Sequence, residues 1–200
     1  MAARPLDSAC RGVPAVSETR PAADPPVVPH SLRARLTVIA PGLAELVPYA
    51  GGWLFDQVMA GWDVAVLTAG QADPRPLRIL GARGYDLETV LAVPLAGRCL
   101  QAIAVQANLY RSDARVRRMV YHALDRDLAE VRLWGGDWPE DLDGGTRPVR
   151  HQLSVAARAF KAHALAAAAA PDAASDDTEE FRTGRIRRPD LAVLSSGSGD

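Results

Sequence analysis

One apolar run constrains the fold of this 200-residue chain more than any other feature. Residues 63–69, Asp-Val-Ala-Val-Leu-Thr-Ala, are almost continuously apolar after the first position, and Gly61 and Gly70 flank them. A strand that is apolar on both faces is buried on both faces, as in a parallel sheet covered by helices. The run therefore predicts a strand inside such a sheet.

Hydrophobic periodicity and turn residues predict the other elements. Strands are expected at 35–40, 76–82 and 129–134, and helices at 42–62, 100–107, 116–124 and 148–169. Within the first helix, Pro48 and Gly51-Gly52 predict a break, and Gly61 is placed to end the helix in a left-handed conformation. The short link between strands 63–69 and 76–82 leaves no room for a helical crossover, so we expect them to be antiparallel or non-adjacent.

Strands interleaved with helices give a single α/β domain over residues 31–170. We expect a small mixed, partly parallel sheet of three to four strands covered by amphipathic helices. Residues 1–30 carry six prolines and scattered charges, which predicts a disordered N-terminal extension. An acidic run, an arginine-rich stretch and a Ser/Gly ending predict a disordered C-terminal tail over 171–200.

The charge composition excludes a dedicated nucleic-acid binder, because the formal net charge is only -1. Of 23 basic residues, Lys161 is the one lysine and the others are arginines. With heavy use of alanine, this is typical of a GC-rich bacterial genome. The choice of arginine over lysine therefore carries no argument for bidentate recognition.

The two cysteines, Cys10 and Cys99, cannot build a disulfide framework, and neither has a second ligand nearby in the sequence. No window of about 18 residues is apolar throughout, and the first 20 residues lack the apolar core of a secretory signal. These features predict a cytoplasmic protein without a membrane partner.

A first candidate site lies at the loops after the strands that end near Ala69 and Ala82. Ligands of open α/β sheets bind outside the carboxyl ends of strands, where arginines can hold an anion. The candidate ligand-binding residues are Asp63, Asp73, Arg75, Arg78 and Arg83. The competing interpretation is a set of solvated arginines beside an Asp-Pro turn, with Asp63 as a turn cap rather than a catalytic base.

A second candidate is a basic patch of Arg111, Arg115 and Arg118, which follow one another at i, i+4 and i+7. On one helix this spacing makes a positive face that can meet phosphates or an acidic partner. A charged face in contact with water explains the same spacing. Aromatic residues that could stack on bases are not interleaved with the arginines, so nucleic acid is an unlikely partner.

Catalytic and metal-binding motifs are absent from the sequence. The histidines His30, His122, His151 and His163 are isolated, and no nucleophile elbow, Walker loop or dinucleotide fingerprint occurs. We therefore predict no catalytic residues, no metal and no cofactor.

The missing motifs favour a non-catalytic protein-interaction or ligand-binding domain over an enzyme. Its partner would be an unknown protein or a second copy of the chain. The alternatives are a small-molecule or nucleotide-dependent enzyme with its site at the loops near Ala69 and Ala82, and weak nucleic-acid binding through the arginine clusters.

Overall fold

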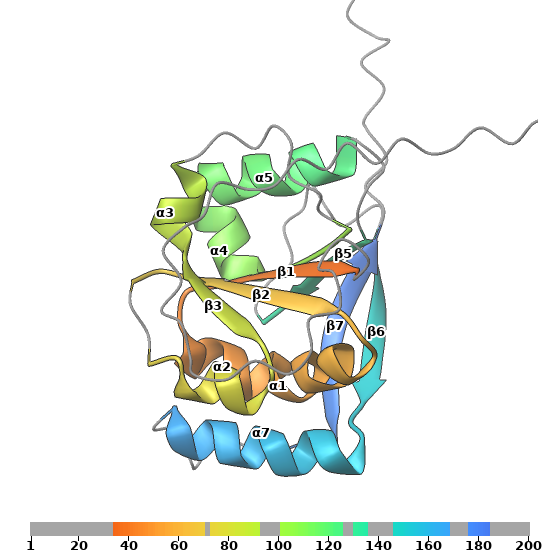
Figure 1. Ribbon diagram of the computed structural model, residues 1–200. Coiled ribbons are helices and arrows are strands. Elements are labelled where there is room, and N and C mark those ends of the chain that lie inside the picture. Colours follow the sequence, from red (N-terminus) through yellow and green to blue (C-terminus); the bar gives the residue numbers. More distant parts are fainter. Residues whose placement is uncertain are drawn as a thin grey trace, which may run out of the picture.

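The computed structural model describes residues 34–70, 73–92, 101–125, 130–135, 146–168 and 176–184 (Figure 1). Its strands are β1 (Arg35–Ala40), β2 (Asp63–Thr68), β3 (Arg83–Asp86), β4 (Ala102–Gln106), β5 (Glu130–Trp134), β6 (Thr146–Gln152) and β7 (Thr178–Gly184). Its helices are α1 (Leu43–Met59), α2 (Arg75–Ile79), α3 (Leu87–Leu91), α4 (Ala107–Ser112), α5 (Ala114–Asp125) and α7 (Val155–Ala167).

The described strands form one seven-stranded sheet in the order β3-β2-β1-β4-β5-β7-β6. Strands β3, β2, β1, β4 and β5 are parallel, and β7 runs antiparallel to both β5 and β6. The predicted α/β class and mixed sheet are confirmed. The expected size of three to four strands is wrong, because β3, β4, β6 and β7 were not recognised as strands.

Helices cover both faces of the parallel part of the sheet (Figure 1). Helices α1, α2 and α7 lie on one face and α3, α4 and α5 on the other, and α7 packs outside α1 and α2. Along β2, Val64 and Val66 face the α1 side, whereas Leu67 faces the α5 side. The predicted two-sided burial of this strand is confirmed, and so are the strands at 35–40 and 129–134.

Residues 76–82 were predicted as a strand but belong mainly to α2. Pro76 is placed in the first turn, where its missing N–H costs nothing, and Leu77 and Leu80 are buried at helical spacing. Gly81 follows with a φ of 76°. The chain from Thr68 to Arg83 is thus a helical crossover, and it makes β3 a parallel neighbour of β2.

The segment 100–107 was predicted as a helix but contains β4. Residues 102–105 are all buried, because β4 lies inside the sheet with helices on both sides. Continuous burial leaves no polar side to show the period of a strand, and the small apolar residues there also fit helical spacing.

Helix α1 runs without the predicted interruption through Pro48 and the two glycines. Gly52 is required for close packing, because a Cβ there would lie 2.6 Å from carbons of Leu153. Gly61 has a φ of 93°, which confirms the predicted left-handed residue after the helix.

The predicted helix 148–169 begins only at Val155, because residues 146–152 pair with β7 as strand β6. The Oγ of Ser154 accepts a hydrogen bond from the N–H of Ala157 at 3.0 Å and caps α7.

The predicted disordered tail is wrong for Thr178–Gly184, which form β7 between β5 and β6. Glu179, Phe181 and Thr183 alternate as its buried side, and the carboxylate of Glu179 is paired there. The predicted extension 1–30 and the end of the tail lie outside the described residues, as do Cys10, Cys99 and His30.

No described helix combines the length and the apolar character needed to cross a membrane.

Candidate functional site

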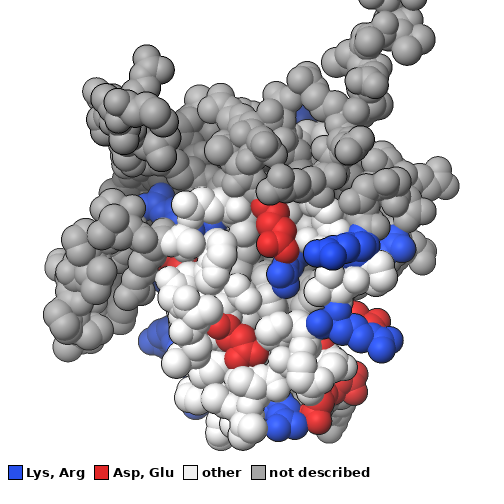
Figure 2. Space-filling view, turned by 90° about the vertical axis from the view of Figure 1, so that its right-hand side faces the viewer, with Lys and Arg blue, Asp and Glu red and all other residues white. Residues whose placement is uncertain are grey.

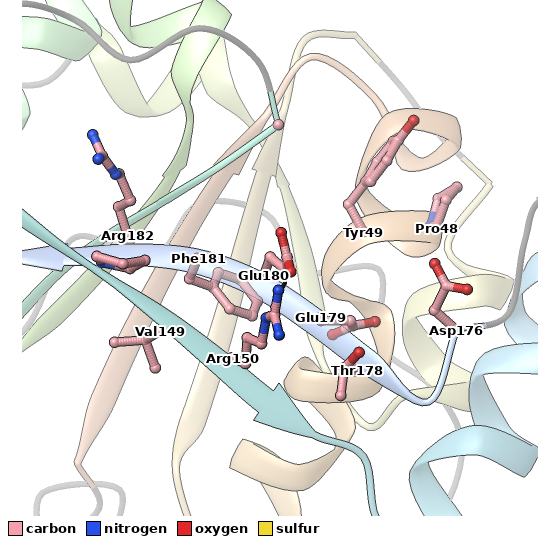
Figure 3. A pocket seen from close by; sticks show the side chains of 12 residues that line it. Pro48, Tyr49, Val149, Arg150, Asp176, Thr178, Glu179, Glu180, Phe181 and Arg182 are labelled. Atoms are coloured by element: carbon pink, nitrogen blue, oxygen red, sulfur yellow. Dashed lines mark hydrogen bonds and ion pairs between the residues drawn. The ribbon is translucent and has the colours of Figure 1, made fainter.

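A pocket of about 470 Å³ lies between α1 and the paired strands β6 and β7 (Figure 3). Gly135, which directly follows β5, forms part of its lining. Leu133 of β5 pairs with Arg182 of the antiparallel β7, so the residues before Arg182 continue past the carboxyl end of β5. The pocket thus lies beyond the end of a parallel strand, where open α/β sheets bind their ligands.

The pocket lining combines an apolar wall with charged groups. Figure 3 shows Pro48 and Tyr49 projecting from α1, Arg150 from β6 and Glu180 from β7. The Nε of Arg150 donates to Oε1 of Glu180 at 2.8 Å, and both side chains are largely exposed. Figure 2 shows acidic and basic side chains side by side on the face of the molecule near β6 and β7. They do not form separate acidic and basic patches there.

The pocket also contains the carboxylates of Glu179 and Asp176, which differ in their partners. Both oxygens of Glu179 accept hydrogen bonds, from Lys161 Nζ at 2.8 Å and from the N–H groups of Gly52 and Trp53 at 3.0 and 2.7 Å. Asp176 is exposed and has no hydrogen bond or ion pair with any other described residue. Of these two carboxylates, only that of Asp176 is available to a bound molecule.

A second polar cluster, the α1–α7 latch, consists of Asp56, His151 and Ser154. His151 Nε2 lies 2.8 Å from Asp56 Oδ2, and the Oγ of Ser154 donates to Asp56 Oδ1 at 2.6 Å. Burial raises the pKa of Asp56, but the hydrogen bonds from Ser154 and His151 outweigh it and hold this pKa below its ordinary 3.8. The hydroxyl of Ser154 faces a carboxylate rather than the imidazole, so the latch is no activated nucleophile.

Two polar side chains at the carboxyl ends of β3 and β4 serve as helix caps. Asp86 accepts hydrogen bonds from the N–H and the Oγ1 of Thr89 at 2.8 Å, and these bonds lower its pKa. Gln106 accepts from the N–H of Leu109 at 3.2 Å. Both groups are used in starting α3 and α4.

The five predicted ligand-binding residues do not form one site. Asp63 begins β2 and pairs with Arg83, which begins the parallel β3, at the amino ends of these strands. Asp73 lies beyond the opposite end of β2, where it accepts from the N–H of Arg75 at 2.9 Å. Arg75 and Arg78 are exposed on α2. Asp73 therefore starts a turn, as the competing interpretation held.

The predicted basic patch is also divided. Arg111 belongs to α4, whereas Arg115 and Arg118 belong to α5, so one helical face does not carry all three. Arg115 donates to both oxygens of Glu88 at 2.7 and 2.8 Å and to Asp113 at 2.8 Å. The bonds from Arg115 lower the pKa of Asp113 to about 2. Two carboxylates thus neutralise the central arginine of the patch.

Sequence reasoning missed the pocket because its residues were assigned to other structures. Arg150 was placed in a helix and Glu180 in a disordered tail. The sequence of 178–184 does not alternate apolar and polar residues, although burial alternates along β7, so the segment lacks the period-2 signal of a strand.

Solved structures share this arrangement of strands and helices. The crystal structure of A40926 pseudoaglycone deacetylase Dbv21 matches with a TM-score of 0.53 and 17% identity, over 78% of this chain and 99% of that chain. A teicoplanin deacetylase in complex with teicoplanin matches with a TM-score of 0.54 and 12% identity, over 77% and 100%. The chain has the LmbE-like fold.

N,N'-diacetylchitobiose deacetylase from Pyrococcus horikoshii has the same fold, with a TM-score of 0.50 and 13% identity over 78% of this chain and 86% of that chain. No protein-family model and no characterised protein sequence matches this chain. The expectation of a non-catalytic domain is corrected by these comparisons, because these three proteins with the same fold are deacetylases.

A metal ion does not fit the part of the chain that the structure describes. One solved structure with this fold is a zinc-inhibited form of teicoplanin deacetylase. Among the described residues, no three His, Cys, Asp or Glu side chains lie close enough to share a metal ion. Pro41 and Gly42, which follow β1, offer no side-chain ligand.

Proposed function

We propose that this chain is a hydrolase of the deacetylase type, which removes an acyl group from an acylated amine. The amine would bind in the pocket between α1 and the paired strands β6 and β7. The single observation that supports this proposal most is the match to Dbv21, which covers 99% of that deacetylase. The pocket supports it further, because it lies beyond the carboxyl end of β5 and contains a carboxylate without a partner among the described residues.

Asp176 is the residue that we assign as general base. Its carboxylate takes a proton from a water molecule, whose oxygen then forms a bond to the acyl carbon. The same proton passes to the amine nitrogen as the carbon–nitrogen bond breaks, so the products are a carboxylic acid and a free amine. Arg150 and the phenol of Tyr49 are the hydrogen-bond donors in the pocket that can stabilise negative charge on the acyl oxygen.

The experiment incubates the full chain with N,N'-diacetylchitobiose and with acylated glycopeptides, and measures released acid by proton NMR. Parallel samples after chelation and after addition of zinc detect any dependence on metal. We expect turnover, and we expect Asp176→Asn to reduce kcat by about 100-fold or more, because a positioned base contributes at least that much.

Asp177→Asn is the matched control. The carboxylate of Asp177 pairs with Arg158 at 2.9 Å and does not line the pocket. The control should therefore retain most of the activity. Absence of acid release from every substrate would overturn the proposed function, whereas equal losses in the two variants would overturn the role of Asp176 alone.

A further inference from the structure

Helix α1 is continuous, but two of its N–H groups donate to a side chain outside the helix. The N–H of Gly52 donates to Oε1 of Glu179 at 3.0 Å, and the N–H of Trp53 donates to Oε2 at 2.7 Å. Inside an α-helix each N–H ordinarily donates to the carbonyl four residues earlier. For these two N–H groups, that carbonyl belongs to Pro48 and to Tyr49, which are the α1 residues in the pocket.

The carboxylate of Glu179 holds these N–H groups more strongly than a carbonyl does. A hydrogen bond to an ionised acceptor is about twice as strong as one between neutral groups, and a hydrogen that points at one acceptor is poorly aligned with another. Glu179 is 3% exposed, so water does not compete for its oxygens. The carbonyls of Pro48 and Tyr49 therefore lose most of the bonding that their ordinary donors supply.

The sequence of α1 explains why the helix opens at this point. Proline has no N–H and its ring clashes with the carbonyl four residues before it, so Pro48 weakens this turn. Gly51 and Gly52 follow in the next turn, and glycine has the widest backbone freedom. No described group outside α1 donates to the carbonyl of Pro48 or Tyr49. Both oxygens thus resemble those at the end of a helix, which carry partial negative charge.

The charges in the pocket favour a cation beside these two carbonyls. Asp176 lines the pocket with a carboxylate that has no partner among the described residues. Figure 3 shows Arg182 on the side of the pocket away from α1 and Asp176. The other arginine of the pocket, Arg150, is paired with Glu180. The α1 side of the pocket therefore offers hydrogen-bond acceptors and negative charge.

We propose that the carbonyls of Pro48 and Tyr49 form, with the carboxylate of Asp176, a subsite for a primary ammonium group. Such a group has three N–H donors and no acceptor, which matches three acceptors. Its role rests on the proposed function: the subsite holds the nitrogen of the released amine in its protonated form. The proton comes from the carboxylic acid that is released in the same reaction.

Carbonyl NMR of the full chain tests whether these oxygens are available. Tyr49–Ala50 is the one Tyr-Ala pair in the sequence, so tyrosine with a ¹³C carbonyl and ¹⁵N-alanine report this carbonyl alone. The pair Tyr121–His122 within α5, labelled with ¹⁵N-histidine instead, is the matched helical control. The Tyr49 carbonyl should resonate upfield of the Tyr121 carbonyl, because its hydrogen bond is weaker.

Methylammonium is the probe, and tetramethylammonium is the control cation because it has no N–H to donate. Methylammonium should move the Tyr49 resonance downfield and leave that of Tyr121 in place, whereas tetramethylammonium should move neither. Asp176→Asn should weaken the binding of methylammonium by about tenfold or more, because it removes a charge-assisted hydrogen bond. Asp177→Asn should leave the binding unchanged, because Asp177 pairs with Arg158 and does not line the pocket.

Two results would overturn the subsite. One is an equal response to the two cations, and the other is a Tyr49 carbonyl that resonates with the helical control and moves with neither. Circular dichroism checks the folding of the variants, and the comparison of the two cations on the wild type decides if a variant does not fold. Binding of methylammonium without acid release from any acylated amine would overturn the proposed function alone. Acid release without binding of methylammonium would overturn the subsite alone.

Discussion

Lys161 and Arg115 donate to carboxylates at nearly the same distance but on opposite faces of the sheet. On the α1–α7 face, Lys161 Nζ lies 2.8 Å from Glu179, and each of these side chains is 1% exposed. On the α3–α5 face, Arg115 lies 2.7 Å from Glu88, and their side chains are 44% and 59% exposed. Ion pairs with nearly equal lengths thus occupy very different dielectric surroundings.

The comparison teaches that burial, rather than distance, decides what each pair contributes. Water screens an exposed pair, and holding two long side chains in place costs entropy, so such pairs contribute little. A buried pair gains little over an apolar replacement, but loss of one partner leaves the other charge desolvated and alone. The buried pair also anchors two N–H groups of α1 through Glu179. It therefore ties α1, α7 and β7 together.

The largest effect should come from Lys161→Met, which removes the charge while nearly keeping the volume. The carboxylate of Glu179 is then buried without its cation, so the free energy of unfolding should fall by about 3–5 kcal/mol. Urea denaturation measures this loss.

The double variant Lys161→Met with Glu179→Gln checks the reason for that loss. It should recover part of the stability, because the unpaired charge is gone while the amide oxygen can still accept from one of the two N–H groups of α1. A double variant less stable than Lys161→Met would contradict the role of charge in this pair.

An intermediate effect is expected at the half-buried α1–α7 latch. Asp56→Asn weakens the bonds to His151 and Ser154 and should lower the free energy of unfolding at neutral pH by about 1–2 kcal/mol. Because the folded state lowers the pKa of Asp56, the carboxylate's contribution is complete above pH 3.8. It is lost as the pH falls through the lower pKa of the folded state.

The difference between the wild type and Asp56→Asn should therefore stay constant on acidification to about the ordinary pKa of aspartate and shrink only below it. Asp73→Asn serves as the control, since Asp73 is exposed and accepts one local N–H. A difference that already vanishes near neutral pH would assign the effect to a group other than Asp56.

The smallest effect should come from Arg115→Ala on the exposed side. Although this guanidinium bonds two carboxylates, solvent screens Arg115 and Glu88, whose side chains are largely exposed. The urea midpoint should shift by less than about a third of the shift in Lys161→Met, and added salt should reduce it further. A shift as large as that of Lys161→Met would show that burial is not the deciding factor.

The sequence determined the parts of this protein whose signal is local. Gly61 requires a left-handed backbone, and the run 63–69 is too apolar to face water on either side. These features located β2 correctly, and the β-branched run at 35–40 located β1. Residues 100–107 were assigned to the wrong element, because a short apolar segment buried on all sides shows no periodicity that separates a helix from a strand. Residues 76–82 were also assigned to the wrong element, although Arg78 is exposed and Leu77 and Leu80 are buried at helical spacing.

Only the tertiary structure decided where the charges and the pocket lie. Residues 178–184 resemble a solvated acidic segment until β5 and β6 pair with them and Lys161 neutralises Glu179. The residues that form the pocket come from α1, from the end of β5 and from the β6–β7 region, which are far apart in the chain. Their meeting depends on long-range strand pairing, and no local pattern of residues records such pairing.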